Sequence, residues 1–280
     1  VSRKGIRFLD LQNPDIFHKK LSSLMEYHNF LLKEYFHESP IEVNNVEDEI
    51  FKKYEEVSSF IIDTDEYIND LCKQGGVLFE GAQGTMLDID HGTFPYVTSS
   101  NTTLPGVVSG TGVNMGLIKY GLGITKAYST RVGHGPFPSE LKNEIGMKIG
   151  EIGGEVGATT GRTRRCGWLD LKVLKKSIRI NNLSGIALTK IDVLDQFDEI
   201  SICTNYGNIN YETFEVQDLE FITLPGWQSS TVGIREFDKL PINAKKYIET
   251  IENLANTSVD IISTGPARDQ IIQKINILDD

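Results

Sequence analysis

Apolar positions recur at helical spacing near the start of the chain. Asn13 offers a capping side chain, and Pro14 follows as the residue preferred at a first helical position. Apolar side chains then recur every three or four residues, which predicts a long amphipathic helix that ends near Tyr35. A second helical region is predicted over 45–73, where the charged residues form a solvated face.

From residue 77 the pattern changes to short apolar runs that are typical of buried strands. These runs are VLFE (77–80), GIALTK (185–190), EISICTNY (199–206) and VDIIS (259–263). Helical periodicity is found at 113–127, 139–150, 169–181 and 241–256. Strands that alternate with helices predict an α/β fold with a mainly parallel central sheet flanked by helices. Because no linker is evident, we expect a single α/β domain over 1–280, with a largely helical segment 1–75 and a ligand-binding part 76–280.

The charge of the chain limits its partners. A formal net charge of −11, from 28 basic and 39 acidic residues, argues against a nucleic-acid or anionic-membrane surface. No apolar run approaches the ~20 residues needed to span a bilayer. The charge is uneven, however, because 158–179 carries seven basic residues and one acid, which indicates an anion site.

Three widely spaced cysteines fit neither a disulfide framework nor a zinc site, so we expect a cytoplasmic protein.

The stretch EGAQGTMLDIDHGTFPYVTSSN at 80–101, here called the Asp88 loop, collects small polar side chains after an apolar run. Asp88, Asp90 and His91 could be metal ligands or an acid–base pair. Apolar residues interleave with the two aspartates, which favours a structural hydrogen-bonding role instead. Gln83 differs, because an amide both donates and accepts and therefore suits the lactam-like edge of a base.

The segment TKID at 189–192, here called the guanine segment, ends the predicted strand GIALTK. Guanine-binding proteins carry an [NT]KxD segment at such a strand end. By this pattern the carboxylate of Asp192 is expected to accept hydrogen bonds from N1–H and the exocyclic amine of guanine, and the stem of Lys190 is expected to lie along the ring. Adenine presents no such pair of donors. After another predicted strand, STG at 263–265, here called the STG loop, offers backbone N–H groups to the same ligand. The alternative for TKID alone is an ordinary surface loop.

The stretch GATTGRTRR at 157–165, here called the anion loop, combines small hydroxyl residues with three arginines. Backbone amides and Thr hydroxyls can bind a carboxylate, and arginine adds a bidentate fork for carboxylate or phosphate. The alternative is a solvent-exposed basic turn. No GxxxxGK[ST] sequence is present, so the phosphates of a bound nucleotide must be held by something outside this chain.

Several segments together closely resemble the adenylosuccinate synthetase family, in the same order along the chain. They are FEGAQGTMLDIDHGTFPYVTSSNTT, KAYSTRVGHGPFPSEL, GATTGRTRRCGWLDL, LTKIDVLDQFDEI, LPGW and STGPARD, within a similarity that runs from about Arg3 to the C-terminus. The resemblance implies a P-loop-NTPase-like fold of a guanine-nucleotide ligase. It also implies the reaction: GTP phosphorylates the 6-oxygen of IMP, and the amine of L-aspartate then displaces phosphate to give adenylosuccinate.

The resemblance also implies roles for individual residues. Gln83 is expected to bind the IMP base and to polarise its 6-position, and Thr98 is expected to hold the IMP phosphate. Arg162 would face the ribose and the aspartate carboxylate, with Thr159 and Thr160 in the aspartate loop. The residues expected to bind GTP are Arg164, Lys190, Ile191, Asp192, Ser263, Thr264 and Gly265. Arg3 matches an arginine that family members extend across a homodimer interface to the partner's IMP phosphate.

The family also has features that this chain does not show. They are a GDEGKGK-type phosphate loop, a catalytic Asp that ligates Mg²⁺, and a His that acts as an acid. The resemblance therefore implies that the N-terminal third is absent, that the main Mg²⁺ ligands lie outside this chain, and that these residues alone do not turn over. Two alternatives remain open: a binding module for guanine nucleotide and IMP without catalysis, and a different GTP-using C–N ligase.

Overall fold

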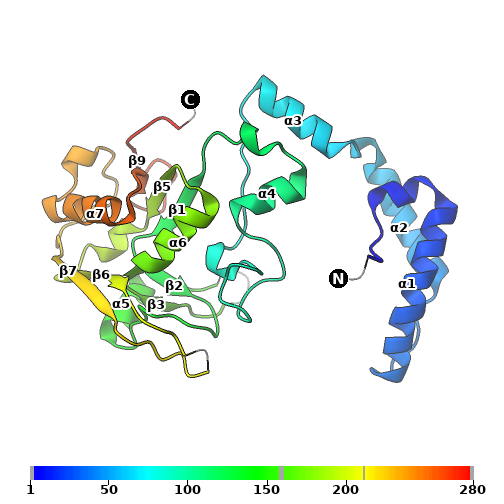
Figure 1. Cartoon of the computed structure of the whole chain (residues 1–280), viewed down its shortest axis with the longest axis horizontal. Coiled ribbons are helices and arrows are strands. Elements are labelled where there is room, and N and C mark those ends of the chain that lie inside the picture. Colours follow the sequence, from blue (N-terminus) through cyan, green and yellow to red (C-terminus); the bar gives the residue numbers. More distant parts are fainter. Residues whose placement is uncertain (1–2, 158–160, 211, 278–280) are drawn as a thin grey trace. The chain divides into compact units, whose positions relative to one another are not determined.

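The computed structural model describes residues 3–157, 161–210 and 212–277 (Figure 1). They group into two compact units, Val1–Tyr67 and Ile68–Asp280. The boundary falls inside helix α3 (Thr64–Gln74). Each unit is described by itself below, and the single domain expected over 1–280 stays a prediction.

The first unit is helical. It contains the 3-10 turns η1 (Phe8–Gln12) and η2 (Ser58–Phe60) and the helices α1 (Pro14–Glu34) and α2 (Val43–Val57). The Asn13 side chain accepts a hydrogen bond from the N–H of Ile16, and Pro14 opens α1, so the predicted start of this helix is confirmed. Helices α1 and α2 lie side by side (Figure 1), with buried Phe17 packed edge-on against Phe51.

The second unit is built on a mainly parallel sheet. Its strands are β1 (Leu122–Lys126), β5 (Gly185–Thr189), β8 (Val259–Ser263) and β9 (Ile271–Gln273), in the order β1-β5-β8-β9. The first three are parallel, and β9 is antiparallel to β8. The predicted α/β class with a mainly parallel central sheet is therefore confirmed.

Two smaller sheets and further helices complete the second unit. One sheet pairs β2 (Ser129–Arg131) with β3 (Arg165–Gly167), and the other has the order β4 (Leu169–Asp170), β6 (Glu199–Asn205), β7 (Glu220–Pro225). The helices are α4 (Leu104–Thr111), α5 (Glu144–Ile152), α6 (Leu171–Asn181) and α7 (Ile242–Ala255). Short 3-10 turns lie at η3 (Thr85–Leu87), η4 (Met115–Leu117), η5 (Ile191–Leu194) and η6 (Phe237–Lys239).

The core of the second unit lies between the parallel sheet and its helices. Ile186 and Leu188 of β5 are fully buried and belong to one apolar cluster with Leu171 of α6 and Ile248 of α7. A strand buried on both faces reads as a continuous apolar run, which is why GIALTK and VDIIS are recognisable in the sequence. Since parallel strands end at the same edge, the last residues of β1, β5 and β8 lie together there.

Two predicted elements are wrong. The helix expected at 113–127 is replaced by η4 and strand β1, because residues 122–126 pair with β5 and this tertiary pairing overrides the local pattern. An added Cβ at Gly123 would lie 2.3 Å from Leu183 Cδ1, so a side chain there would displace the end of that leucine. The strand expected at 77–80 does not form: among the described strands none pairs with it, and Leu78 is 90% exposed.

Candidate functional site

The guanine segment begins where β5 ends. Lys190 has a φ of 61°, and this left-handed residue turns the chain from the strand into η5. The next acidic residue, Asp192, is half-buried. Burial raises the pKa of Asp192, and the nearby charge of Asp195 raises it further, against the opposing effects of its own N–H and Lys190. A carboxylate in this position is stabilised by any ligand that brings a pair of N–H donors to it.

The buried carboxylate of Asp195 holds the turn that follows the guanine segment. The Nε1–H of Trp227 donates to Asp195 at 2.7 Å, and the N–H and hydroxyl of Thr231 both donate to Asp195 at 2.8 Å. All three side chains are buried. The LPGW stretch therefore has a structural role, because it fixes the turn that carries Asp192.

The STG loop lies beside the guanine segment. Strands β5 and β8 are parallel with Leu188 opposite Ile262, so residues 189–192 and 263–265 meet at the same edge of the sheet. Thr264 is fully buried; its N–H donates to Gln270 and its hydroxyl donates to Ile234. Thr264 thus supports the loop from inside, and its contact with a ligand stays a prediction. Ser263 and Gly265 are half-buried.

A single buried carboxylate joins the guanine segment to the anion loop. The Glu155 side chain is 0% exposed and accepts from Lys126 Nζ at 2.7 Å, Tyr128 Oη at 2.5 Å and Arg164 Nη1 at 2.8 Å. Lys190 Nζ lies 3.2 Å from the same carboxylate. Burial acts to raise the pKa of Glu155, but the hydrogen bonds from Lys126, Tyr128 and Arg164 outweigh it and hold the pKa at about 2. These residues are called the Glu155 cluster below.

The described ends of the anion loop pair with each other next to Glu155. The N–H of Arg164 donates to the carbonyl of Glu155 at 2.9 Å, and the N–H of Gly157 donates to the carbonyl of Arg162 at 2.8 Å. Glu155 and Arg164 therefore close the base of the loop through both backbone and side chains. Arg162 is exposed. The expected aspartate contacts Thr159 and Thr160 lie outside the described residues.

The Asp88 loop is organised around Asp88 itself. Its fully buried carboxylate accepts from the N–H groups of Asp90 (3.0 Å), His91 (2.9 Å) and Thr102 (2.7 Å). Burial opposes ionisation, but these backbone donors outweigh it and lower the pKa of Asp88. The Asp90 carboxylate in turn accepts from Asn101 at 2.9 Å. The predicted hydrogen-bonding role of the two aspartates is therefore confirmed.

Gln83 and Thr98 lie at opposite ends of the Asp88 loop. Gln83 is exposed with a φ of 61°, and the N–H of half-buried Thr98 donates to the carbonyl of Leu87. Among the described residues, no hydrogen bond joins either of them to the guanine segment. Arg3 is exposed and belongs to the first unit. The structure therefore brings together the expected GTP-binding residues, while the expected IMP contacts lie on separate elements.

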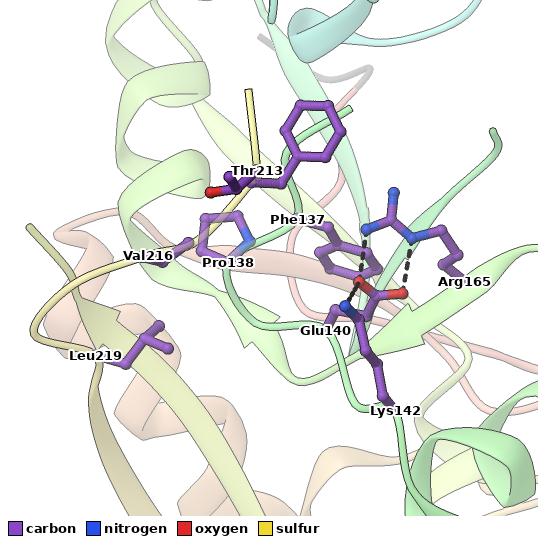
Figure 2. A pocket seen from close by; sticks show the side chains of 9 residues that line it. Phe137, Pro138, Glu140, Lys142, Arg165, Thr213, Val216 and Leu219 are labelled. Atoms are coloured by element: carbon purple, nitrogen blue, oxygen red, sulfur yellow. Dashed lines mark hydrogen bonds and ion pairs between the residues drawn. The ribbon is translucent and has the colours of Figure 1, made fainter. Parts of the chain in front are cut away.

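A cavity of about 200 Å³ lies at the C-terminal end of the anion loop, between the Arg165–Glu140 ion pair and residues 213–219. Figure 2 shows the Arg165 guanidinium facing both oxygens of Glu140, with N–O distances of 2.7 and 2.5 Å. Arg165 also donates to the carbonyls of Gly133 and Gly135. Because these charges satisfy each other and no predicted site residue lines the cavity, it is not the candidate site.

Sequence reasoning missed Lys126, Tyr128 and Glu155. The signal for Glu155 is an acid directly before the anion loop, three residues outside the basic window 158–179. Lys126 and Tyr128 lie in the segment KAYSTRVGHGPFPSEL, which contributes to the resemblance but shows no recognisable site pattern of its own.

Two features are absent from the described residues. Among those residues, no group of three or more His, Cys, Asp or Glu side chains could hold a metal ion. No helix in the described ranges is long and apolar enough to cross a membrane.

Comparisons with known proteins agree on one family. The sequence model of adenylosuccinate synthetase matches residues 1–272. The adenylosuccinate synthetase of Ruthia magnifica subsp. Calyptogena magnifica is 47% identical over 290 residues, covering 97% of this chain and 66% of the relative. That of Chromohalobacter salexigens is 46% identical over 282 residues, covering 97% of this chain and 65% of the relative.

A solved structure, fully ligated adenylosuccinate synthetase from Plasmodium falciparum, matches with a TM-score of 0.85 and 37% identity, over 98% of this chain and 67% of that one. The chain thus spans 65–66% of the length of the two curated relatives. With a family match over nearly all of its residues and the fold of a solved member, the chain belongs to the adenylosuccinate synthetase family.

Proposed function

We propose that the protein carrying this chain ligates IMP and L-aspartate at the expense of GTP, giving adenylosuccinate, GDP and phosphate. Within it, this chain supplies the recognition of IMP, aspartate and guanine. The observation that carries the proposal is that the guanine segment and the STG loop meet at one edge of the sheet. The half-buried carboxylate of Asp192 lies there, in a turn that the hydrogen bond from Trp227 to Asp195 holds in place. Membership of the family supports the same reaction.

The chemistry needs two steps because the 6-oxygen of IMP is a poor leaving group. In the first step the γ-phosphoryl group of GTP is transferred to this oxygen, which gives 6-phosphoryl-IMP and GDP. In the second step the aspartate nitrogen attacks C6, the C–O bond breaks, and phosphate leaves as the amine loses a proton. Two steps of moderate barrier thus replace one prohibitive step.

Guanine selectivity follows from the environment of Asp192. The carboxylate accepts from guanine N1–H and the exocyclic amine, while the aliphatic stem of Lys190 covers the ring. Burial already raises the free energy of the ionised carboxylate, as its raised pKa shows. A base without the two donors leaves this charge unpaired in a partly dry site, and such a mismatch is costly.

The remaining contacts are assigned by motif. Gln83 binds the IMP base and polarises its 6-position, and Thr98 holds the IMP phosphate. Arg162, with Thr159 and Thr160, takes the aspartate carboxylate. Support comes from the Asp88 hydrogen bonds, which define the loop that spaces Gln83 from Thr98.

GTP contacts and oligomeric state are proposed in the same way. Arg164 reaches GTP, which is further bound by Ile191 and Lys190 and by the STG loop residues. Arg3 extends to the IMP phosphate of a partner subunit in a homodimer. The reaction takes place in the cytoplasm, which is supported by three cysteines that are all free.

Mg²⁺ does not fit the two buried carboxylates Glu155 and Asp88. Both oxygens of Glu155 are occupied by cationic and hydroxyl donors, and both oxygens of Asp88 accept backbone N–H groups. A carboxylate so engaged cannot also coordinate a cation without losing its partners. This supports the proposal that the main Mg²⁺ ligands of the reaction lie outside this chain.

The test compares the chain with a hybrid ligase. The hybrid joins this chain to the segment of the Ruthia magnifica relative that it does not span. With IMP, GTP, Mg²⁺ and aspartate, the chain alone is expected to release no phosphate above background, and the hybrid is expected to form adenylosuccinate, measured by chromatography. A hybrid that binds GDP and IMP but forms no product would instead support the binding module without catalysis.

A further inference from the structure

The Glu155 cluster collects residues from three separate parts of the fold. Lys126 is the last residue of β1, Arg164 directly precedes β3, and Lys190 directly follows β5. All three cationic groups lie within 3.2 Å of the carboxylate of Glu155. Two of them, Arg164 and Lys190, are also the cations proposed to contact GTP.

The cluster has a surplus of positive charge that faces outward. One carboxylate is opposed by three cations, and the carboxylate is 0% exposed, whereas the side chains of Lys126, Arg164 and Lys190 are 24%, 30% and 36% exposed. An arrangement with the anion inside and the cations outside attracts an anionic ligand. It also fixes where the cations stand before the ligand arrives, which lowers the cost of ordering them.

Glu155 also forms the base of the anion loop. Its carbonyl accepts the N–H of Arg164, and Val156 bridges to Thr163 in antiparallel fashion. Lys190 additionally donates to the carbonyl of Gly153 at 2.5 Å, two residues before Glu155. Any ligand that holds Lys190 in place therefore acts, through Glu155 and Gly153, on the backbone from which the anion loop starts.

We propose that Glu155 is a positioning residue that couples the guanine segment to the anion loop, so that guanine-nucleotide binding at Lys190 stabilises the base of that loop, residues 156–157 and 161–164. This inference rests on the proposed function for the identity of the ligand. It adds to that function a physical link by which the nucleotide prepares the second substrate site.

The test uses hydrogen exchange on the chain itself, with GDP as the probe at a saturating concentration. In the unsubstituted chain GDP is expected to slow exchange of the amides of residues 189–192 and, about fivefold, of residues 156–157 and 161–164, a ratio at the low end of typical coupling between sites. Glu155→Asp retains the charge but withdraws the carboxylate by about 1.5 Å, one C–C bond. It can then no longer reach cations from three elements at once.

In Glu155→Asp, GDP is expected to protect residues 189–192 still, but it no longer slows the exchange of residues 156–157 and 161–164. The matched control is Glu140→Asp, which shortens the neighbouring carboxylate that pairs with Arg165 but contacts neither Arg164 nor Lys190. The control is expected to retain the fivefold effect. A purely structural role for Glu155 would accelerate exchange with and without GDP alike and leave the ratio unchanged.

Fivefold protection of the loop that persists in Glu155→Asp overturns the inference. Protection of residues 189–192 by GDP without protection of the loop in the unsubstituted chain also overturns the inference. That result would still support the proposed guanine site. GDP that protects neither segment, in the chain and in the hybrid ligase alike, refutes the proposed guanine site, and the coupling with it. If Glu155→Asp does not fold, Tyr128→Phe replaces it, because this change removes the uncharged hydroxyl donor of Tyr128 to Glu155. The ratio of loop exchange rates without and with GDP is then expected to fall at least twofold. An unchanged ratio overturns the inference.

Discussion

The sharpest prediction concerns Asp192→Asn. The asparagine side chain has nearly the shape of aspartate, but it offers one acceptor and one N–H₂ donor where guanine needs two acceptors. One hydrogen bond to a charged group is lost, and a donor then faces a donor of the base. A hydrogen bond to a charged group contributes about 1.5–3 kcal/mol, so GDP affinity is expected to fall about 10- to 100-fold.

The same substitution is not expected to destabilise the fold. Because burial raises the pKa of Asp192 above its usual value, the ionised carboxylate is less stable in the folded than in the unfolded chain above that pKa. A neutral amide removes this cost. The melting temperature of Asp192→Asn at pH 7 is therefore expected to equal or exceed that of the unsubstituted chain, so weaker binding cannot be attributed to unfolding.

Isothermal titration of the chain with GDP measures the effect, and xanthosine diphosphate provides the matched ligand. Xanthine carries a carbonyl in place of the exocyclic amine, which the asparagine N–H₂ can donate to, so its affinity is expected to rise as that of GDP falls. A folded Asp192→Asn chain with GDP affinity within twofold of the original would refute the guanine assignment.

Three further predictions concern other parts of the second unit. Arg162→Leu in the hybrid ligase is expected to weaken aspartate and IMP binding by about 2–5 kcal/mol, because a carboxylate is left unpaired; an unaltered KM for aspartate would exclude this role. Trp227→Phe removes a donor to the buried carboxylate of Asp195 and is expected to cost about 1–3 kcal/mol in urea unfolding, with weaker GDP binding; no change in either would contradict the anchoring role. The pKa of Glu155, about 2 against an ordinary 4.5, means that its stabilisation is present above pH 4.5 and is lost as pH falls towards 2; a urea midpoint that stays constant over this range would contradict it.

Much of the fold was readable in the sequence where local and tertiary preferences agree. Asn13 and Pro14 mark the start of α1, and the fully buried strands β5 and β8 appear as continuous apolar runs. The helix at 113–127 failed for the opposite reason. Its apolar spacing suits a helix, but pairing with β5 determines that residues 122–126 form a strand.

The candidate site divides in the same way. The sequence by itself predicted a chemistry for each segment: a carboxylate that suits guanine at 192, arginines for anions after 160, and hydrogen-bonding aspartates in the Asp88 loop. Only the tertiary structure decided that Glu155 holds Lys126, Arg164 and Lys190 at one point. Lys126 and Lys190 are far apart in the sequence and meet because the parallel strands β1 and β5 end at a common edge, while the backbone hydrogen bond from Arg164 to Glu155 brings the arginine beside them. One buried carboxylate requires several cationic partners to remain charged.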